Sequence, residues 1–272
     1  MTRLLFKRIT NKRKFTIFVH NNMFGANRME TFRRESNQPM PYNVIVDGKP
    51  TLTVKQFRGG SVARTLYTNR TAMETWNKFY VRWQSEAYPP FVREGINIEA
   101  AFRRFWERAS DPNDVARNHP VNDQLHGDFS QHYAGLAFDV GHGQGIMHSE
   151  FRKIALREKN LIGQVGWRQI YAGGNFVHMD AGLHRDYRRM RIKGYPNQQL
   201  GDIGVYVFII QDAMRHQGLC ATWSGEFDIP THTAVRQFQQ THNLTVDGII
   251  GQQTWHMIHS RVHGGRQGLA IS

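Results

Sequence analysis

The sequence predicts two folded parts: a mixed α+β part and, after it, a small all-α unit of three helices. Two observations predict this division. Stretches with strand-like alternation and stretches with helical spacing both occur up to about residue 190, whereas only helical spacing follows residue 200. The chain has 272 residues, 40% of them hydrophobic, which is enough for about two domains with buried cores.

The first part is expected to contain strands and helices in alternation. Residues 1–40 carry no strong periodicity, and we interpret them as a basic N-terminal arm or a peripheral strand. Residues 51–57 alternate as a strand does, and a pair of glycines ends them. Apolar residues over 71–83 recur at close to helical spacing, which predicts a helix, and residues 96–102 are interpreted as a buried strand.

The middle of the chain is more polar. Residues 110–129 are rich in Pro, Gly, Asn and Asp, which indicates a long loop, and such loops in compact domains are often functional. A short helix is expected over 154–163 and a strand over 176–180. The predicted boundaries are an arm over 1–40, a first domain over 41–192, a linker over 193–200, a three-helix domain over 201–260 and a tail over 261–272.

The last part has the pattern of a compact helical unit. Helices are expected over 203–218 and 231–241, followed by a turn at Asp247-Gly248 and a short helix over 254–258. The single cysteine, Cys220, cannot form an internal disulfide, and its apolar neighbours favour a core position over a nucleophilic role.

The formal net charge of +13 favours an anionic partner, such as nucleic acid, a membrane surface or an acidic wall polymer. The excess is regional, because residues 1–40 hold nine basic and two acidic residues, whereas residues 200–260 hold two basic and five acidic ones. No nucleic-acid-binding motif is present, so we expect no nucleic-acid partner.

Membrane insertion and export by a leader are not expected. No apolar run approaches the roughly 20 residues that a membrane helix needs. The apolar stretch over 15–19 is also shorter than the roughly 7–15 residues of a signal-peptide core. We therefore expect no membrane span, and a protein that stays in the cytoplasm until it is released or exported by another route. We also expect the protein to be a monomer.

The stretch from Ser130 to Asp139 carries the most informative chemistry. It places His132 and Asp139 seven residues apart, and imidazole and carboxylate are both ligands of Zn²⁺. Seven residues of extended chain cannot bring both side chains to one ion, so a bend is required. Gly135 permits such a bend, because glycine adopts backbone conformations that other residues avoid.

A catalytic zinc site needs three protein ligands and one open position. The third ligand is expected from the predicted strand over 176–180, where His178 and Asp180 point to the same face. The candidate zinc ligands are therefore His132, Asp139 and His178. Spacing alone does not decide this, because a chain with 14 histidines produces such a pair by chance.

The stretch from Ser130 to Asp139 matches the Ser-x-His-x-x-Gly-x-Ala-x-Asp signature of the zinc D-alanyl-D-alanine carboxypeptidase family at every fixed position. Residues 176–180, Phe-Val-His-Met-Asp, resemble the second metal motif of that family. Its relatives include L-alanyl-D-glutamate endopeptidases and, distantly, hedgehog signalling domains. The resemblance spans roughly residues 42–190. It implies an α+β fold with a small antiparallel sheet, zinc on the three candidate ligands and cleavage of peptides in the bacterial wall.

By the same resemblance, Arg103 lies where the family has an arginine that faces the substrate's carboxylate or carbonyl, a role that suits the planar guanidinium. A solvated surface position is the alternative for Arg103. Ser130 is assigned with Arg103 to substrate binding. Many family members carry an acidic general base three residues before the last zinc histidine, but here that residue is Asn175. Asp180 is either the base or a carboxylate that orients an imidazole, and the sequence does not separate these roles.

Residues 201–258 resemble the three-helix peptidoglycan-binding domain that is attached to many wall hydrolases. Most matching residues have structural explanations, since they form a core at helical spacing or permit turns. The Phe-Gly pair typical of that family is Phe227-Asp228 here. The residues that carry the resemblance are Gly204, Val205, Gln211, Gly218, Phe227, Thr231, Ala234, Val235, Phe238, Gln239, Leu244, Asp247, Gly248, Ile249, Ile250, Gly251, Thr254 and Trp255.

Together the two resemblances imply a zinc-dependent peptidase that hydrolyses stem peptides of bacterial peptidoglycan, as a D-Ala-D-Ala carboxypeptidase or a related endopeptidase. A wall-binding module would help by raising the local concentration of enzyme on an insoluble polymer. A phage or prophage endolysin and a bacterial wall-remodelling enzyme both fit the sequence. The alternative is a catalytically weak or inactive wall-binding protein on a peptidase fold, which Asn175 motivates.

Overall fold

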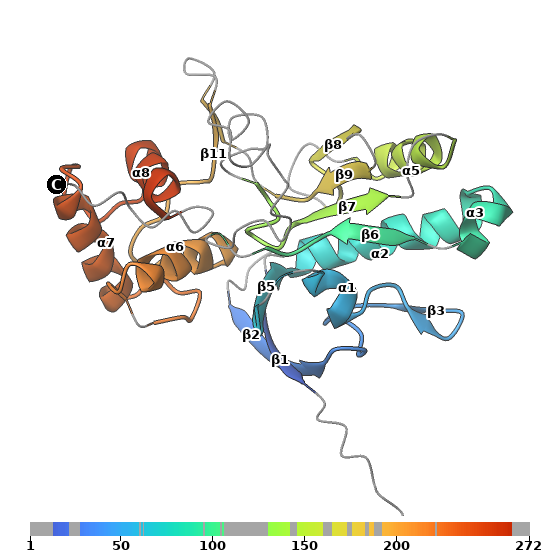
Figure 1. The fold of residues 1–272 in the computed structure, drawn as a ribbon, viewed down its shortest axis with the longest axis horizontal. Coiled ribbons are helices and arrows are strands. Elements are labelled where there is room, and N and C mark those ends of the chain that lie inside the picture. Colours follow the sequence, from blue (N-terminus) through green and yellow to red (C-terminus); the bar gives the residue numbers. More distant parts are fainter. Residues whose placement is uncertain are drawn as a thin grey trace, which may run out of the picture.

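The computed structural model describes residues 13–262 except for 22–27, 60, 62, 95, 104, 106–129, 142–145, 160–164, 173–175, 183–184, 188–191 and 221. The predicted loop over 110–129 therefore lies outside the described residues, as does most of the predicted tail. Within the described ranges, small sheets and their helices precede three C-terminal helices (Figure 1). The predicted order of an α+β part and a helical unit is confirmed.

The first sheet has three strands in the order β2-β1-β5, with β1 (Lys14–His20) between β2 (Met29–Glu35) and β5 (Thr65–Asn69). β1 runs antiparallel to β2 and parallel to β5, and its alternate residues from position 15 to position 19 are buried. The interpretation of residues 1–40 as an arm or peripheral strand is wrong for β1, whereas β2 is an edge strand of this sheet. Pairing with β5, which comes much later in the chain, places β1 in the centre of a sheet.

The predicted strand over 51–57 is also wrong, because most of this stretch forms the helix α1 (Val54–Arg58). The helix begins with a capping box. The hydroxyl of Thr53 accepts a hydrogen bond from the backbone N–H of Gln56, and the Gln56 side chain accepts one from the backbone N–H of Thr53. Local hydrogen bonding at the helix start therefore outweighs the strand-like alternation of the side chains.

The predicted helix over 71–83 is confirmed as α2 (Arg70–Glu86). Its N-cap, Asn69, accepts a hydrogen bond of 2.7 Å from a backbone N–H of the first turn. On the buried face of the helix, Trp76 stacks on Phe138 of the second sheet with ring centroids 4.7 Å apart. The helix thus packs against the sheet that carries the candidate site.

This second sheet has four antiparallel strands in the order β6-β7-β9-β8. The strands predicted over 96–102 and 176–180 are confirmed as β6 and β9, whereas α5 (Ile146–Arg157) begins and ends earlier than the helix predicted over 154–163. The strand bounds are β6 (Asn97–Ala100), β7 (Ala137–Gly141), β8 (Gln169–Ala172) and β9 (Phe176–Asp180). Shorter elements are β3 (Ile45–Val46), β4 (Lys49–Pro50), α3 (Pro89–Glu94), β10 (Arg185–Tyr187) and β11 (Ile192–Gly194).

The three predicted C-terminal helices are confirmed as α6 (Val205–His216), α7 (Ile229–Thr241) and α8 (Gln252–Val262), the last being longer than expected. We call them the C-terminal unit. The predicted turn before α8 is present at Gly248, which has a φ of 76°. Cys220 is buried and carries no disulfide, in agreement with the expected core position.

Each connection between these helices is built around a buried glutamine amide. Gln211 of α6 accepts a hydrogen bond of 2.9 Å from the N–H of Gly225 and donates one of 3.0 Å to the hydroxyl of Thr231. Gln239 of α7 accepts one of 2.8 Å from the N–H of the turn glycine and donates one of 3.2 Å to the hydroxyl of Thr254. In both cases one side chain joins a loop to the beginning of the next helix.

The C-terminal unit packs directly on the first sheet. Phe208 of α6 is fully buried and stacks on Tyr67 of β5, with ring centroids 4.9 Å apart and an angle of 6° between the rings. Phe18 of β1 also contacts Phe208, with ring centroids 5.0 Å apart. The buried apolar residues of both parts form one continuous core.

The predicted linker over 193–200 connects the two parts, and its middle is packed although Asn197, Gln199 and Leu200 are exposed. Tyr195 is fully buried, with its ring centroid 5.2 Å from that of Tyr206 and 5.1 Å from that of Trp255. The indole N–H of Trp255 donates a hydrogen bond of 3.0 Å to the carbonyl of Pro196. The Gly, Pro and Asn content of the segment therefore reflects its irregular backbone, not freedom of movement.

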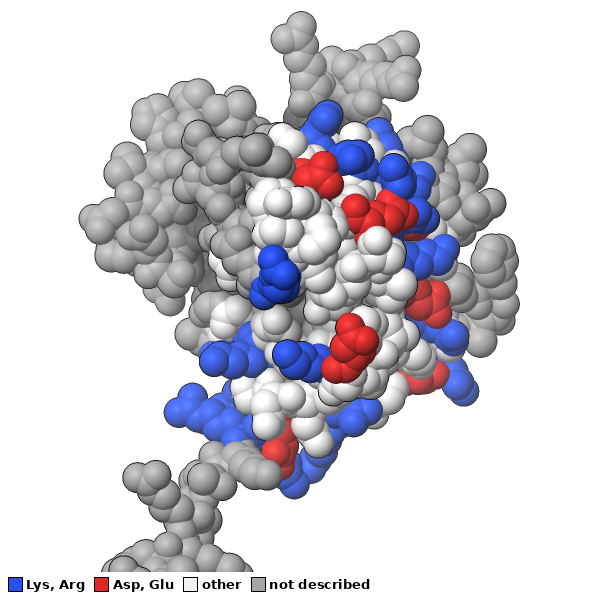
Figure 2. Space-filling view, turned by 90° about the vertical axis from the view of Figure 1, so that its right-hand side faces the viewer, with Lys and Arg blue, Asp and Glu red and all other residues white. Residues whose placement is uncertain are grey.

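Basic and acidic side chains lie near one another on the face that Figure 2 shows, rather than forming one basic stripe. Arg82 of α2 illustrates such neighbours, because it contacts both Glu86 and Glu158 at 2.6 Å. Local pairing of this kind leaves the net charge unchanged, but it places negative charge beside positive charge on the surface. Among the helices that the structure describes, none combines the length and the apolar character needed to cross a lipid bilayer.

The shared core makes a first prediction. Phe208→Ala should lower the free energy of unfolding by about 3–5 kcal/mol, because it removes a fully buried ring and leaves a cavity between the two parts. Denaturant unfolding followed by tryptophan fluorescence measures the change. Ile229→Ala is the control, since Ile229 is 71% exposed and its truncation should cost less than about 0.5 kcal/mol. Equal effects of the two substitutions would contradict the shared core.

Candidate metal centre

His132 lies in a tight turn, residues 130–136, which we call the His132 turn and which directly precedes β7. Two backbone N–H groups of the turn donate to the carbonyl of Gln131, at 2.9 and 3.2 Å. Gly135 has a φ of +66°, and a Cβ atom there would lie 1.9 Å from the carbonyl oxygen of Tyr67. Glycine is therefore required both for the predicted bend and for the close approach of the turn to β5.

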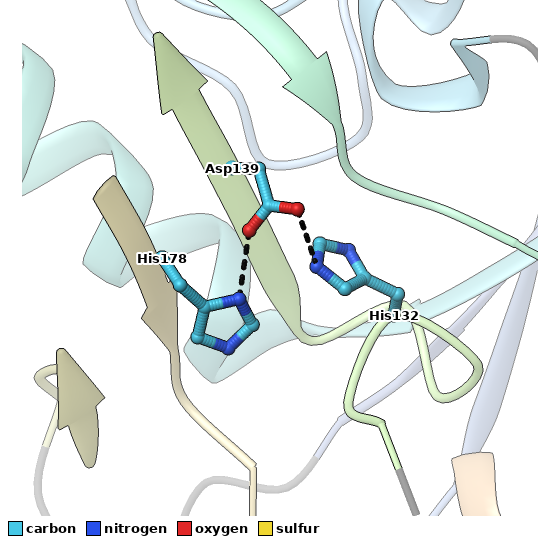
Figure 3. A group of neighbouring side chains, drawn as sticks. All are labelled: His132, Asp139 and His178. Carbon is cyan, nitrogen blue, oxygen red and sulfur yellow. Dashed lines mark hydrogen bonds and ion pairs between the residues drawn. The ribbon is translucent and has the colours of Figure 1, made fainter. Parts of the chain in front are cut away.

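Strand register brings the other two candidate ligands together. β7 and β9 are antiparallel neighbours, and Asp139 pairs directly with His178. Side chains of directly paired residues lie next to each other on one face of a sheet. The His132 turn folds back toward this face, so that His132, Asp139 and His178 point toward one another (Figure 3).

The Asp139 carboxylate lies between the two imidazoles (Figure 3). Its Oδ1 is 2.7 Å from Nδ1 of His178, and its Oδ2 is 3.2 Å from Nε2 of His132. The other nitrogen of each ring has a separate partner. Nδ1 of His132 is 2.8 Å from the carbonyl oxygen of Ala101, and Nε2 of His178 is 3.1 Å from Oδ2 of Asp180. These outer partners orient the remaining nitrogens toward the cluster.

All three side chains are buried, which makes their mutual interactions strong. Burial lowers the pKa of His178, but the hydrogen bonds and negative charges of Asp139 and Asp180 outweigh burial and raise this pKa to about 9. Burial raises the pKa of Asp139, but the charge of the neighbouring His132 and the hydrogen bond and charge of His178 outweigh burial and hold this pKa well below its usual range. Asp139 is therefore an anion at neutral pH.

The donor atoms of the cluster suit a divalent metal ion such as zinc. Because the Ala101 carbonyl can only accept a hydrogen bond, the neutral form of the His132 ring has its proton on Nδ1 and its lone pair on Nε2, which is the atom that could bind a metal. This Nε2 is buried without a hydrogen-bond partner, since its contact with Asp139 has the distance of an ion pair but not the geometry of a hydrogen bond. One donor atom from each of His132, Asp139 and His178 lies within 4.8 Å of the others, compared with about 3.3 Å between ligands of a tetrahedral zinc site. The group could therefore hold a metal ion.

Arg103 and Ser130, the two residues expected to bind substrate, both lie near His132. Ser130 is two residues before it in the chain, and Arg103 contacts its backbone. The backbone N–H of Arg103 donates a hydrogen bond of 3.2 Å to the carbonyl of His132, and the Arg103 side chain is half-buried. The hydroxyl of Ser130, which is also half-buried, accepts a hydrogen bond of 3.4 Å from the N–H of His132. Asn175, the position of the family's general base, lies outside the described residues.

Asp180, the candidate catalytic residue, is fully buried. Besides its contact with His178, it accepts a hydrogen bond of 3.2 Å from the backbone N–H of Gly182. Asp180 and His178 lie on one face of β9, as the alternation of the strand predicted.

Tyr171 of β8 also lies at the cluster, and the sequence reasoning missed it. Its ring stacks on the imidazole of His178, with centroids 4.5 Å apart and 18° between the planes, while 44% of the residue is exposed. Burial, followed by the negative charges of Asp139 and Asp180, raises the pKa of Tyr171 to about 12, so its hydroxyl is protonated at neutral pH. A four-residue edge strand gives little periodicity, and only its pairing with β9 reveals the position of Tyr171.

Comparison with known proteins identifies the C-terminal unit. Residues 207–258 match the family model titled "Putative peptidoglycan binding domain". The expected resemblance to a wall-binding domain is thereby confirmed for these residues. No peptidase family model matches the chain, and no curated protein and no solved structure matches it. The zinc peptidase resemblance of the first part stays a prediction.

The His132 turn makes a second prediction. Gly135→Ala should lower the free energy of unfolding by about 2–5 kcal/mol, because alanine at a positive φ is strained and its Cβ would overlap the Tyr67 carbonyl. Gly218→Ala is the matched control: Gly218 has a φ of +71° and open space around it, so only the strain of about 1–2 kcal/mol applies. Denaturant unfolding compares the two, and equal losses would show that the close approach to β5 is unimportant.

Proposed function

We propose that the chain is a zinc-dependent peptidase that hydrolyses stem peptides of bacterial peptidoglycan, as a D-Ala-D-Ala carboxypeptidase or a related endopeptidase. The buried cluster of His132, Asp139 and His178 carries this proposal, because two imidazoles and one carboxylate converge there. The peptidoglycan-binding match over 207–258 supports the wall as the substrate. The signature from Ser130 to Asp139 supports the choice of a peptidase over other metal-dependent hydrolases.

Zinc bound to this cluster would polarise the scissile carbonyl and bring the pKa of a bound water to about 7. The protein's own contribution is to hold the ligands in place. Asp139 joins both imidazoles, and the Ala101 carbonyl fixes the ring of His132 through its outer nitrogen. Two neutral imidazoles and one carboxylate leave a net positive charge on a bound divalent ion, which favours a substrate carbonyl.

We infer that Asp180 is a positioning residue, not the general base. Its carboxylate is fully buried, lies 3.1 Å from Nε2 of His178 and accepts the N–H of Gly182, so its oxygens are already used. A general base must reach the proton that it abstracts. A carboxylate on the outer nitrogen of a ligating histidine instead fixes the ring and increases its basicity.

Arg103 is proposed to bind the carboxylate of the substrate, with Ser130 lining the same side of the site. Arg103 is tied to the carbonyl of His132 through its own backbone N–H, which places it close to the cluster. A guanidinium matches a carboxylate with two parallel hydrogen bonds.

We propose that the chain acts at the bacterial cell wall as a monomer, with peptidoglycan as its partner and without nucleic acid. Both an endolysin of phage or prophage origin and a bacterial wall-remodelling enzyme would meet this substrate after release or export. The basic character of the chain suits an anionic wall.

The function makes a third prediction. The purified chain should hold about one zinc per molecule and release new amino and carboxyl ends from isolated sacculi. His132→Ala should lose the metal and lower the rate of release by roughly 10³-fold or more, because the metal contributes several kcal/mol to the transition state. Elemental analysis measures the zinc, and mass spectrometry of digested sacculi locates the bond. His216→Ala, in the last turn of α6, is the control and should change neither.

The outcomes separate the candidate functions. Release of peptide ends that stops with a chelator and returns with zinc supports the peptidase. Stoichiometric zinc and wall binding without any release would instead favour an inactive wall-binding protein on a peptidase fold. Absence of zinc from the purified chain, even after incubation with the metal, would overturn the proposed metal site.

The role of Asp180 makes a fourth prediction. Asp180→Asn should weaken zinc affinity by about 10–100-fold, because the outer nitrogen of His178 loses its carboxylate, and excess zinc should restore most of the activity. Chelator competition and the zinc dependence of the rate measure these effects. A loss of about 10²–10⁴-fold that persists at saturating zinc, with unchanged zinc affinity, would make Asp180 the base. Asp247→Asn, in the exposed turn before α8, is the control.

A further inference from the structure

We propose that the C-terminal unit and its connecting segment position the metal site, in addition to the wall binding that the family match indicates. Two buried tyrosines carry the proposal: Tyr206 of α6, and Tyr195 of the connecting segment, which comprises residues 193–200. Both hold the His132 turn by their hydroxyl groups. The inference about the turn stands on the fold alone, whereas its effect on zinc rests on the proposed function.

The two hydroxyls bond to the two residues that directly precede His132. The hydroxyl of Tyr206 donates a hydrogen bond of 3.1 Å to Oε1 of Gln131, whose side chain is almost fully buried. The hydroxyl of Tyr195 donates to the backbone carbonyl of Ser130. One bond fixes a side chain and the other fixes the backbone, so the start of the turn is held in both respects.

Gln131 also packs against the chain that follows β9, the strand that carries His178. A Cβ atom on Gly182 would lie 2.1 Å from Oε1 of Gln131, so the amide packs tightly on the chain just after β9. The N–H of Gly182 donates to Asp180, and Asp180 in turn contacts the outer nitrogen of His178. Gln131 is therefore in contact with α6 on one side and with the surroundings of His178 on the other.

The tyrosines are themselves fixed by the packing of the C-terminal unit. Their rings lie 5.2 Å apart, and Tyr195 lies 5.1 Å from Trp255 of α8. Phe208, which lies in the same turn of α6 as Tyr206, stacks on Tyr67 of β5 and so fixes this end of α6. On its other side the turn contacts β5: a Cβ on Gly135 would overlap the carbonyl of Tyr67, and the hydroxyl of Thr68 donates a hydrogen bond of 2.6 Å to the carbonyl of Gly135, so the turn lies between β5 and the two tyrosine hydroxyls.

Removal of one buried hydroxyl should therefore loosen the turn without unfolding the protein. A typical intramolecular hydrogen bond corresponds to a factor of about 2–10 in an opening equilibrium. In Tyr206→Phe, we expect backbone amides of residues 130–136 to exchange hydrogen about 2–10-fold faster, and zinc to bind more weakly by a similar factor. The double variant Tyr195→Phe/Tyr206→Phe should show a larger effect of each kind.

The control is Tyr42→Phe. It makes the same chemical change at a tyrosine whose hydroxyl contacts Glu30 in the first part of the chain. Its thermal stability should fall by a similar amount, while exchange in residues 130–136 and zinc affinity stay at the values of the unchanged protein. Hydrogen exchange is measured by mass spectrometry on the full chain, and zinc affinity by competition with a chromophoric chelator.

Hydrogen exchange is measured first on the chelator-treated protein, so that it tests the positioning role independently of zinc. Faster exchange confined to the turn supports the proposal even if the unchanged chain binds no zinc, an outcome that would overturn only the proposed peptidase. Unchanged exchange in residues 130–136 of both tyrosine variants would overturn the positioning role. The same holds if zinc affinity falls equally in Tyr42→Phe, because the effect would then follow from general stability.

Discussion

The structure of the site depends on the buried negative charge of Asp139. Asp139 lies inside the protein, where an uncompensated carboxylate would be costly, and two imidazoles compensate it from opposite sides. This requirement fixes the direct pairing of β7 with β9, because His178 must stand beside Asp139. It also fixes the reversal at Gly135, because His132 must return to the same face of the sheet. A metal ion in this position would supply a positive charge that compensates Asp139 directly.

A second constraint is the core that both parts of the chain share. The strand β1 is buried on one face against the first part, and on the other face Phe18 meets Phe208 of α6. The helices of the C-terminal unit are therefore packed against the first part and do not form a separate tethered module. Their first helix completes the packing of the sheet that also supports the His132 turn. In this protein, the part that matches the peptidoglycan-binding family and the part that holds the proposed metal site share one core.

Much of the site could be predicted from the sequence, because its signals are local. The alternation of β9 places His178 and Asp180 on one face, and Gly135 marks the bend. Contacts between segments far apart in the sequence could not be predicted. One is the pairing of β8 with β9, which brings Tyr171 onto His178, and the other is the pairing of β1 with β5. Neither pairing leaves a pattern within the strands that form it. For α1 the signal was present but overlooked, since Thr53 and the glutamine three residues later form a capping box.

The glutamine amides of the C-terminal unit have a consequence for recognition. Gln211 and Gln239 each accept a hydrogen bond from a backbone N–H of their connection, and each donates one to the hydroxyl of a threonine on the next helix. Buried side chains of the protein itself thus hold both loops. A glycan strand or peptide that met this surface would find it preformed, and little conformational entropy would remain to be lost on contact.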